Sequence, residues 1–252
     1  MNSPIIIIPA RMASTRLPNK PLADIGGAPM IVRVWQQAVA SRLGPVIVAC
    51  AEQEIADAVE DAGGVAVMTD PDLPSGSDRV WQALGKYDPD GKYDIVVNLQ
   101  GDLPTIEPEA LQVVVSALTG SSLDIATLAA EITDMAERDN PNVVKAVFAP
   151  PDADDGGQEW GKADDFTRVN NQPDSATLYH HIGIYAFRRD ALARFVGLPP
   201  SAREIAVKLE QLRALDAGMT IAVACVDTVP LGVDTAADLE QARSFFRARD
   251  TD

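Results

Sequence analysis

The amino-acid sequence predicts an α/β fold in which helices cover a mostly parallel sheet. Residues 5–8 are four consecutive isoleucines, and such a run is typical of a strand buried on both faces of a parallel sheet. Short apolar runs then alternate with amphipathic segments in the order strand, loop, helix, strand, helix, strand. This order predicts right-handed crossover connections between parallel strands.

The expected elements follow from periodicity and from end signals. Pro29 fits the first turn of a helix, since apolar residues then recur with helical spacing. The Gly63–Gly64 pair ends a second helix over residues 52–62. Further helices are expected after Arg79, over residues 109–118, 189–196 and 236–247, and, as a longer one burying Leu209, Leu212 and Leu215, after Ser201. Further strands are expected over residues 46–50, 65–68, 94–99, 124–128, 146–149, 178–187 and 219–226.

Composition restricts the class of protein. The 252 residues carry a net charge of −16. Such a surface repels nucleic acid and anionic membrane, whereas a small anionic substrate can bind where cations converge. No signal peptide and no apolar stretch of ~18 residues is recognisable, which predicts a cytoplasmic protein. Cys50 and Cys225 each end an apolar run and are expected to be buried, reduced thiols without zinc-site spacing.

The loop after the first strand is cationic in an acidic chain. Arg11, Arg16 and Lys20 fall within ten residues, and prolines stiffen the same loop. Guanidinium and ammonium groups on a stiff loop suit a triphosphate, and the loop lies where open α/β sheets bind ligands. The alternative is a solvated surface loop. Neither a G-x-G-x-x-G fingerprint nor a P-loop motif is present.

Two further segments point to an anionic ligand. Ser75, Gly76 and Ser77 precede a helix, where they either cap it or let backbone N–H groups approach a base or phosphate. Asp102 follows a buried strand and a glycine, so it points into the expected ligand crevice. Its carboxylate either binds Mg²⁺, which prefers hard oxygen ligands, or caps the helix expected near Pro108.

The second half of the chain is less regular. Residues 150–176 are rich in Pro, Gly and Asp and predict a flexible, solvated loop. Alternation along residues 178–187 puts His181, Gly183 and Tyr185 on one face, as a pocket wall requires. The alternative for His181 is a structural role. Lys145 directly precedes the strand expected over residues 146–149, and the simplest interpretation of it is an exposed strand residue.

Several blocks, spread from residue 5 to about residue 243, resemble one known family in the family's own order. The sequence is similar to the sugar nucleotidyltransferases and, more narrowly, to the cytidylyltransferases that activate 3-deoxy-D-manno-octulosonate (Kdo) as CMP-Kdo. The blocks are Pro9-Ala-Arg-Met-Ala-Ser-Thr-Arg-Leu-Pro-Asn-Lys-Pro-Leu22, Ser75-Gly-Ser-Asp-Arg79, Gln100-Gly-Asp-Leu-Pro104, His181-Ile-Gly-Ile-Tyr185, Leu209-Glu-Gln-Leu-Arg213 and Gly232-Val-Asp-Thr235.

The resemblance implies an architecture and a set of site residues. It implies one three-layer α/β/α, Rossmann-like nucleotidyltransferase domain over residues 1–252, with a CTP-binding part over about 1–128 and a small sugar-binding and dimerisation lobe over about 129–230. Lys20, Arg11 and Asp102 would be catalytic, and Asp102 and Asp234 would bind Mg²⁺. The nucleotide would contact Pro9, Ala10, Arg11, Arg16, Lys20, Ser75, Gly76, Arg79, Gln100 and Gly101. The sugar would contact Gln100, Arg168, His181, Tyr185, Glu210 and Gln211.

The reaction expected from this resemblance is transfer of CMP from CTP to Kdo, with release of pyrophosphate, for lipopolysaccharide core synthesis by a homodimer. His181 is interpreted as a hydrogen-bond donor to a hydroxyl or the carboxylate of the sugar. Asp234 is also a good N-cap candidate for the last helix. The alternatives are a cytidylyltransferase for another 2-keto sugar acid, of the sialic acid or amino-Kdo type, a nucleotide-binding homologue without turnover, and a glycosyltransferase that consumes a finished nucleotide sugar.

Overall fold

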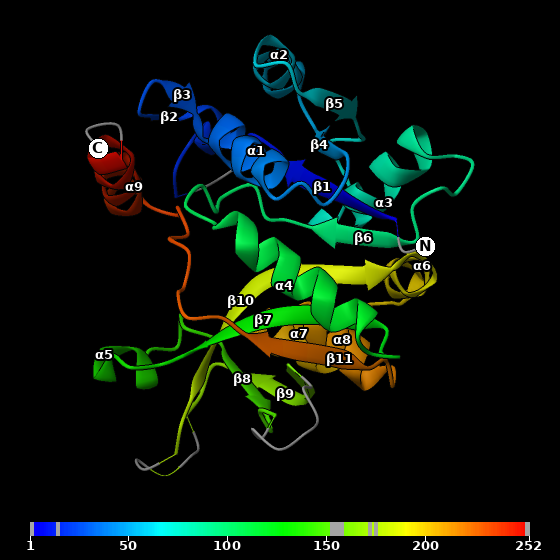
Figure 1. Cartoon of the computed structure of the whole chain (residues 1–252), viewed down its shortest axis with the longest axis vertical. Coiled ribbons are helices and arrows are strands. Elements are labelled where there is room, and N and C mark those ends of the chain that lie inside the picture. The colour runs from blue at the N-terminus through cyan, green and yellow to red at the C-terminus, as the bar shows by residue number, and fades with distance from the viewer. Residues whose placement is uncertain (1–2, 14–15, 152–158, 171–172, 174–175, 250–252) are drawn as a thin grey trace. The chain divides into compact units, whose positions relative to one another are not determined.

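A computed structural model describes residues 3–13, 16–151, 159–170, 173 and 176–249 of the chain. The chain divides into two compact units, one formed by Met1–Gln112 with Pro230–Asp252 and one by Val113–Val229. Within the described ranges, no helix is both long and apolar enough to cross a membrane. The α/β fold predicted from the sequence is confirmed (Figure 1).

The first unit contains a parallel sheet with the strand order β5-β4-β1-β6. Every pairing in this order is parallel, with Ile6 opposite both Val46 of β4 and Val97 of β6. Ile5–Ile8 are fully buried, as expected of a central parallel strand. The bounds are β1 Pro4–Ala10, η1 Lys20–Leu22, β2 Asp24–Ile25, β3 Ala28–Pro29, α1 Met30–Ala40, β4 Val46–Cys50, α2 Gln53–Asp61, β5 Val65–Met68, α3 Gly76–Tyr87, β6 Ile95–Asn98 and α9 Ala236–Arg249.

The strand order creates a switch point between β1 and β6. From β1 the chain runs outward through α1 to β4 and through α2 to β5, and then returns through α3 to β6 on the other side of β1. Right-handed crossovers therefore put α1 and α2 on one face of this sheet and α3 on the other. Ligands of open α/β sheets bind at the carboxyl ends of strands at such a switch point.

Helix α9 packs against the segment that follows the cationic loop. One apolar cluster joins β2 and α1 with the C-terminal segment and contains Ile25, Met30, Val233, Leu239, Ala242 and Phe246. The guanidinium of Arg33 also lies 4.7 Å from the centroid of the Phe246 ring. These contacts hold residues 233–246 beside residues 17–33 although more than 200 positions separate them in the chain.

The second unit contains a mixed sheet with the order β10-β7-β11-β9-β8. Only the β7–β11 pairing is parallel, and the other pairings are antiparallel. Helix α4 crosses the boundary between the units. The bounds are α4 Pro108–Thr119, β7 Ile125–Glu131, α5 Met135–Arg138, β8 Lys145–Phe148, β9 Trp160–Thr167, β10 Tyr179–Arg188, α6 Arg189–Gly197, α7 Ala202–Val207, α8 Gln211–Asp216 and β11 Ile221–Cys225.

Three expected elements differ from the structure. Residues 150–176 were expected as a loop, but β9 runs through them; their residues 152–158, 171–172 and 174–175 lie outside the described part. The helix expected after Ser201 is two helices, α7 and α8, because Lys208 adopts a left-handed conformation with φ 56°. Pro29 precedes α1 at its N-cap position and is not in the first turn.

Two side chains also differ from expectation. Cys50 is buried, but Cys225 is exposed, so the expectation of two buried thiols is wrong for Cys225. The alternative of an exposed Lys145 is wrong, since this side chain is buried and its Nζ donates to the carbonyl of Asn140 at 2.7 Å. The buried ammonium of Lys145 therefore has a hydrogen-bond acceptor, as buried polar groups usually do.

Candidate active site

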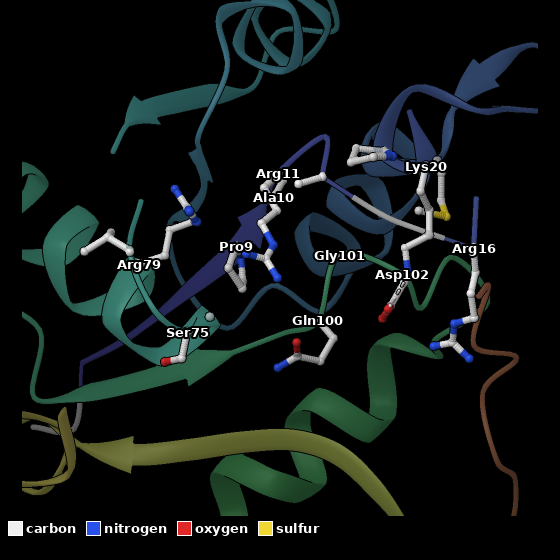
Figure 2. A pocket seen from close by; sticks show the side chains of 15 residues that line it. Pro9, Ala10, Arg11, Arg16, Lys20, Ser75, Arg79, Gln100, Gly101 and Asp102 are labelled. Atoms are coloured by element: carbon white, nitrogen blue, oxygen red, sulfur yellow. Dashed lines mark hydrogen bonds and ion pairs between the residues drawn. The ribbon is translucent and has the colours of Figure 1, made fainter. Parts of the chain in front are cut away.

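The candidate site is a cavity of about 420 Å³ in the first unit. It lies at the carboxyl ends of β1 and β6, where the topology predicts a ligand. Figure 2 shows the labelled side chains around this space. Every predicted nucleotide-binding residue lines it, together with Asp102: Pro9, Ala10, Arg11, Arg16, Lys20, Ser75, Gly76, Arg79, Gln100 and Gly101.

Two carboxylates share one ammonium group at the edge of this cavity. Lys20 Nζ lies 2.8 Å from Asp102 Oδ2 and 3.0 Å from Asp234 Oδ1. Arg16 adds a second cation, since its guanidinium lies 2.8 Å from the other oxygen of Asp234. The two aspartates are 132 positions apart in the chain, yet their contacting oxygens are separated by at most the sum of the two Lys20 distances. Both oxygens therefore lie within reach of one cation.

The pKa of Lys20 reflects this arrangement. Burial acts to lower the pKa of the ammonium, but the charges and hydrogen bonds of Asp102 and Asp234 outweigh burial, so the pKa is raised above its ordinary value of 10.5. The Lys20 side chain is 15% exposed, whereas the carboxylates are 34% and 47% exposed. The lysine is thus charged at neutral pH, and its carboxylate partners stay accessible to a ligand.

Backbone contacts deliver Asp234 to this position. The N–H of Val233 donates to the carbonyl of Asp102 at 2.9 Å, which ties the segment before α9 to the end of β6. The N-cap of α9 is Thr235, whose hydroxyl accepts from the N–H of Asp238. The carboxylate of Asp238 in turn accepts from the N–H groups of Asp234 and Thr235. The expected cap role of Asp234 is therefore wrong, and its carboxylate faces Lys20 instead.

The donor set at Asp102 and Asp234 fits a hard divalent cation. Two carboxylates already converge on one positive charge, and Mg²⁺ is commonly bound by one or two carboxylates with substrate phosphates. In the described part of the chain, no cluster of three or more His, Cys, Asp or Glu side chains could hold a metal by itself. Within the described residues, the Asp102 carboxylate contacts Lys20, so the alternative role of Asp102 as a helix cap finds no support.

The segment from Ser75 to Arg79 forms one wall of the cavity. Ser75 caps α3, because its hydroxyl accepts from the N–H of Asp78 at 3.2 Å. Arg79 is 2% exposed, and its guanidinium donates to the Thr69 hydroxyl and to the carbonyls of Asp70 and Pro71. Arg79 thus lines the cavity but uses these donors to hold the turn over residues 69–71.

The opposite wall depends on close backbone approach. A Cβ at Gly101 would lie 2.9 Å from the carbonyl oxygen of Pro9 and 3.3 Å from Ile31, so only glycine fits without a shift.

Arg11 makes no hydrogen bond or ion pair to another residue in the described ranges, and its side chain is exposed. The cavity therefore contains a guanidinium whose charge is not matched by a neighbouring carboxylate.

The predicted sugar contacts other than Gln100 lie in the second unit. His181 pairs with Ala129 and Tyr185 pairs with Thr127, so both lie on one face of the sheet, as expected. Their rings lie 5.6 Å apart. The pKa of Tyr185 is raised by burial and by the charge of Glu210. Gln211 is 6% exposed, and its Nε2 has no hydrogen-bond partner in the described part.

Arg168 is engaged by the backbone. Its guanidinium donates to the carbonyls of Val207, Pro141 and Lys208 at 2.8, 3.1 and 3.4 Å. These bonds hold together three segments of the second unit. Because they use three of the five N–H groups of the guanidinium, few remain for a ligand.

Comparisons with known proteins identify the family of this chain. The family described as cytidylyltransferase matches residues 5–221. The chain belongs to the cytidylyltransferase family. Two relatives named 3-deoxy-manno-octulosonate cytidylyltransferase, from Parvibaculum lavamentivorans and Rhodospirillum centenum, are 59% and 60% identical; each alignment covers 98% of this chain and 93% and 95% of those proteins.

One solved structure supports the same family, and a more distant one shows the fold. The chain is 36% identical to a CMP:2-keto-3-deoxy-manno-octonic acid synthetase complexed with CTP, with a TM-score of 0.88 over 98% of this chain and 100% of that chain. A 4-diphosphocytidyl-2C-methyl-D-erythritol synthase from Anaerococcus prevotii shares the fold at 12% identity and a TM-score of 0.64, over 98% and 99% of the two chains. The family resemblance predicted from the sequence is confirmed.

Sequence reasoning missed four residues that line the cavity of this cytidylyltransferase family member. They are small or apolar: Ala13, Pro21, Met30 and Leu73. Apolar side chains near a loop do not indicate a ligand-binding site, because the same residue types fill the core. Only their position around a space lined by charged groups assigns them to the site.

Proposed function

We propose that the chain transfers CMP from CTP to Kdo and releases pyrophosphate. The proposal rests on one observation in a member of this family: Asp102 and Asp234 converge on Lys20 beside a cavity at the switch point of a parallel sheet. Relatives more than half identical to this chain are named for this reaction, and a structural neighbour was solved with CTP. Transfer of a nucleotidyl group is the expected chemistry.

The reaction is an in-line displacement at the α-phosphorus of CTP. A hydroxyl oxygen of the sugar acid forms the new bond to phosphorus and loses its proton to solvent. The bond between the α-phosphorus and the bridging oxygen breaks, and pyrophosphate leaves with that electron pair. Such reactions depend on positioning and on stabilisation of negative charge.

The cationic residues supply that stabilisation. Arg11 carries an unmatched charge into the cavity and is proposed to bind the triphosphate. Lys20 is proposed to donate to phosphate oxygens, and Arg16 to hold Asp234 in place. Ala10, Ser75 and Gly76 are proposed to contact the cytidine portion through their backbone.

Asp102 and Asp234 are proposed to bind Mg²⁺. Their oxygens already converge on one cation, and they are partly exposed. When bound, the ion would neutralise charge on the triphosphate oxygens. The chain itself orients these ligands, because the backbone hydrogen bond from Val233 to Asp102 holds the two carboxylates beside each other.

The second unit is proposed to bind the sugar acid. Gln211 carries a buried amide nitrogen without a partner among described residues, and such a group favours a ligand that can accept from it. His181, Tyr185 and Glu210 belong to the same unit. Gln100 belongs to the other unit, and its contact with the sugar stays a prediction. A direct role of Arg168 would require it to give up backbone bonds. The cytoplasmic location and the homodimer stay predictions.

A coupled assay of pyrophosphate release tests this proposal. Purified protein with CTP, Kdo and Mg²⁺ is expected to release pyrophosphate, and sialic acid in place of Kdo is expected to give little. Asp102→Asn is expected to lower turnover about 10²-fold or more, by analogy with the loss of one electrostatic contact to the transition state. The exposed Asp90→Asn serves as a matched control. CTP binding without pyrophosphate release would contradict the proposal.

A further inference from the structure

Strand β10 contains an irregularity opposite Thr127. Ile182 pairs with Leu128 of β7, but Tyr185, three positions later, pairs with the adjacent Thr127. The pairing therefore skips Gly183 and Ile184, and β10 bulges at these residues. A methyl group at Gly183 would meet no atom within 4 Å.

The hydroxyl of Thr127 occupies the gap that the bulge leaves. Thr127 is fully buried, and its Oγ1 lies 2.8 Å from the carbonyl oxygen of Ile184 and 3.2 Å from that of Ile182. Its third neighbour is Nε2 of His181, at 3.0 Å. One side-chain hydroxyl thus meets two carbonyl oxygens and one ring nitrogen.

Counting protons decides the direction of each bond. A carbonyl oxygen can only accept, and the hydroxyl has a single proton, so Thr127 donates toward Ile184 and Ile182. If it donated to His181 instead, its lone pairs would face both carbonyl oxygens at hydrogen-bond distance without a proton between them. The hydroxyl therefore accepts from His181, which places the ring proton on Nε2.

The ring carries only this proton at neutral pH. His181 is 8% exposed and packs edge-on against Phe166, with centroids 4.8 Å apart. Burial, with a smaller contribution from the charge of His180, lowers the pKa of His181 to about 3. A neutral imidazole with its proton on Nε2 has a lone pair on Nδ1. No hydrogen bond from another described residue reaches Nδ1.

We propose that Thr127 is a positioning residue that fixes His181 as the Nε2–H tautomer, so that Nδ1 accepts a hydrogen bond from a hydroxyl of the acceptor sugar. This inference rests on the proposed function, in which His181 contacts the sugar acid. It replaces the donor role expected for His181 from the sequence. A lone pair repels a carboxylate, so the carboxylate of the sugar must be bound by other groups.

Nitrogen-15 NMR of the full-length protein tests the tautomer without activity. The chain has two histidines, so histidine labelling gives two rings, and His180→Gln assigns them. In the wild type the Nε2 signal of His181 is expected at the protonated position and Nδ1 at the unprotonated position. Added Kdo is expected to shift the Nδ1 signal toward lower frequency. A protonated Nδ1 in the wild type would overturn the proposal.

Substitutions at Thr127 test its consequence. Thr127→Val removes the hydroxyl at constant shape and is expected to release the tautomer and raise the KM for Kdo about tenfold, the effect of one hydrogen bond, with the KM for CTP unchanged. Thr127→Ser keeps the hydroxyl and is expected to keep both the tautomer and the KM; it also serves if the valine variant does not fold. Thr119→Val controls for the substitution itself.

Two outcomes separate this inference from the proposed function. An unchanged KM for Kdo in a folded Thr127→Val, or an unchanged tautomer, would refute the role of Thr127. Absence of pyrophosphate release by the wild type with any sugar acid would refute the proposed function. In that case the wild-type NMR spectrum still reports on the tautomer.

Discussion

Replacing Lys20 by methionine tests the centre of the candidate site. Methionine has a similar length and no charge, so the variant leaves Asp102 and Asp234 facing each other without their shared ammonium. Because both carboxylates are 34% or more exposed, solvent screens each ion pair to about 1 kcal/mol or less. Added repulsion between the two carboxylates brings the expected loss to about 2 kcal/mol, or a melting temperature roughly 4–8 °C lower in EDTA.

Added Mg²⁺ is expected to reverse more of this loss in the variant than in the wild type. The ion would replace the missing charge between the carboxylates, whereas in the wild type it competes with Lys20 for them. Turnover is nevertheless expected to fall about 10²–10³-fold, because a metal at the aspartates does not replace a donor to the phosphates. Differential scanning fluorimetry with and without Mg²⁺, beside the pyrophosphate assay, measures both effects.

The pH dependence of this stability difference has a defined sign. The pKa of Lys20 is raised in the folded state, so its contribution is complete below its ordinary pKa of 10.5 and is lost as the pH rises through the folded value. The difference between wild type and variant is therefore expected to stay constant from about pH 6 to about pH 9. The exposed Lys92→Met serves as control. Wild-type turnover together with an unchanged melting temperature in EDTA would refute the reasoning.

Three further outcomes are expected. Gly101→Ala should lower kcat/KM for CTP about tenfold or more, because its methyl group would lie 2.9 Å from a backbone carbonyl of β1; wild-type kinetics would contradict this. Arg213→Met should destabilise the protein by about 3 kcal/mol in urea unfolding at pH 7, since the Arg213 bond that lowers the pKa of Glu204 is lost. That difference should shrink as the pH falls through the lowered pKa of Glu204, and a difference that grows instead would be evidence against it. A thiol reagent at pH 8 should label Cys225 in the folded protein but not Cys50, whose pKa burial raises to about 12; equal labelling would exclude this.

The parallel half of the fold could be predicted almost to the residue. Strands β4 and β5 have the predicted bounds, because each is an unbroken apolar run. Strand β4 is fully buried, as such runs in parallel sheets usually are, whereas β5 lies at the sheet edge and exposes Val65 and Met68. Strand β9 could not be predicted, because only Gly161, Ala163 and Phe166 of Trp160–Thr167 are buried, so the alternation is interrupted, and exposed positions carry Lys162 and Asp164. In a segment already rich in Asp and Gly, this interrupted pattern is weaker than the composition that favours a loop.

The break between α7 and α8 shows a second limit. Lys208 has φ 56°, a conformation that usually selects glycine or asparagine, so the residue type carries no signal for a helix end. The turn is held from outside, since Arg168 donates to the carbonyls of Val207 and Lys208. A helix end produced by a distant side chain cannot be inferred from local periodicity.

Some residues of the candidate site could be predicted from the sequence, and others could not. Arg11, Lys20 and Asp102 could be proposed from the sequence because each follows a buried strand at the edge where ligands bind. Asp234 could be proposed only by resemblance, since 132 positions separate it from Asp102. Its place depends on the apolar cluster that includes Phe246, which no local pattern reports. The proposed tautomer of His181 depends on a β-bulge and could not be predicted from the sequence either.

The charges of the site explain why nucleotide and metal should bind together. The cationic loop brings three positive charges, from Arg11, Arg16 and Lys20, but Asp102 and Asp234 neutralise two of them. Only one charge of this loop therefore remains against a triphosphate, in a chain of net charge −16. Under the proposed function, a divalent cation at the two aspartates would reverse this balance and would free Lys20 to donate to phosphate oxygens. The same aspartates that weaken binding of the bare nucleotide would then favour its metal complex. This dependence would select the metal-bound triphosphate over other anions, without a large positive field that attracts nucleic acid.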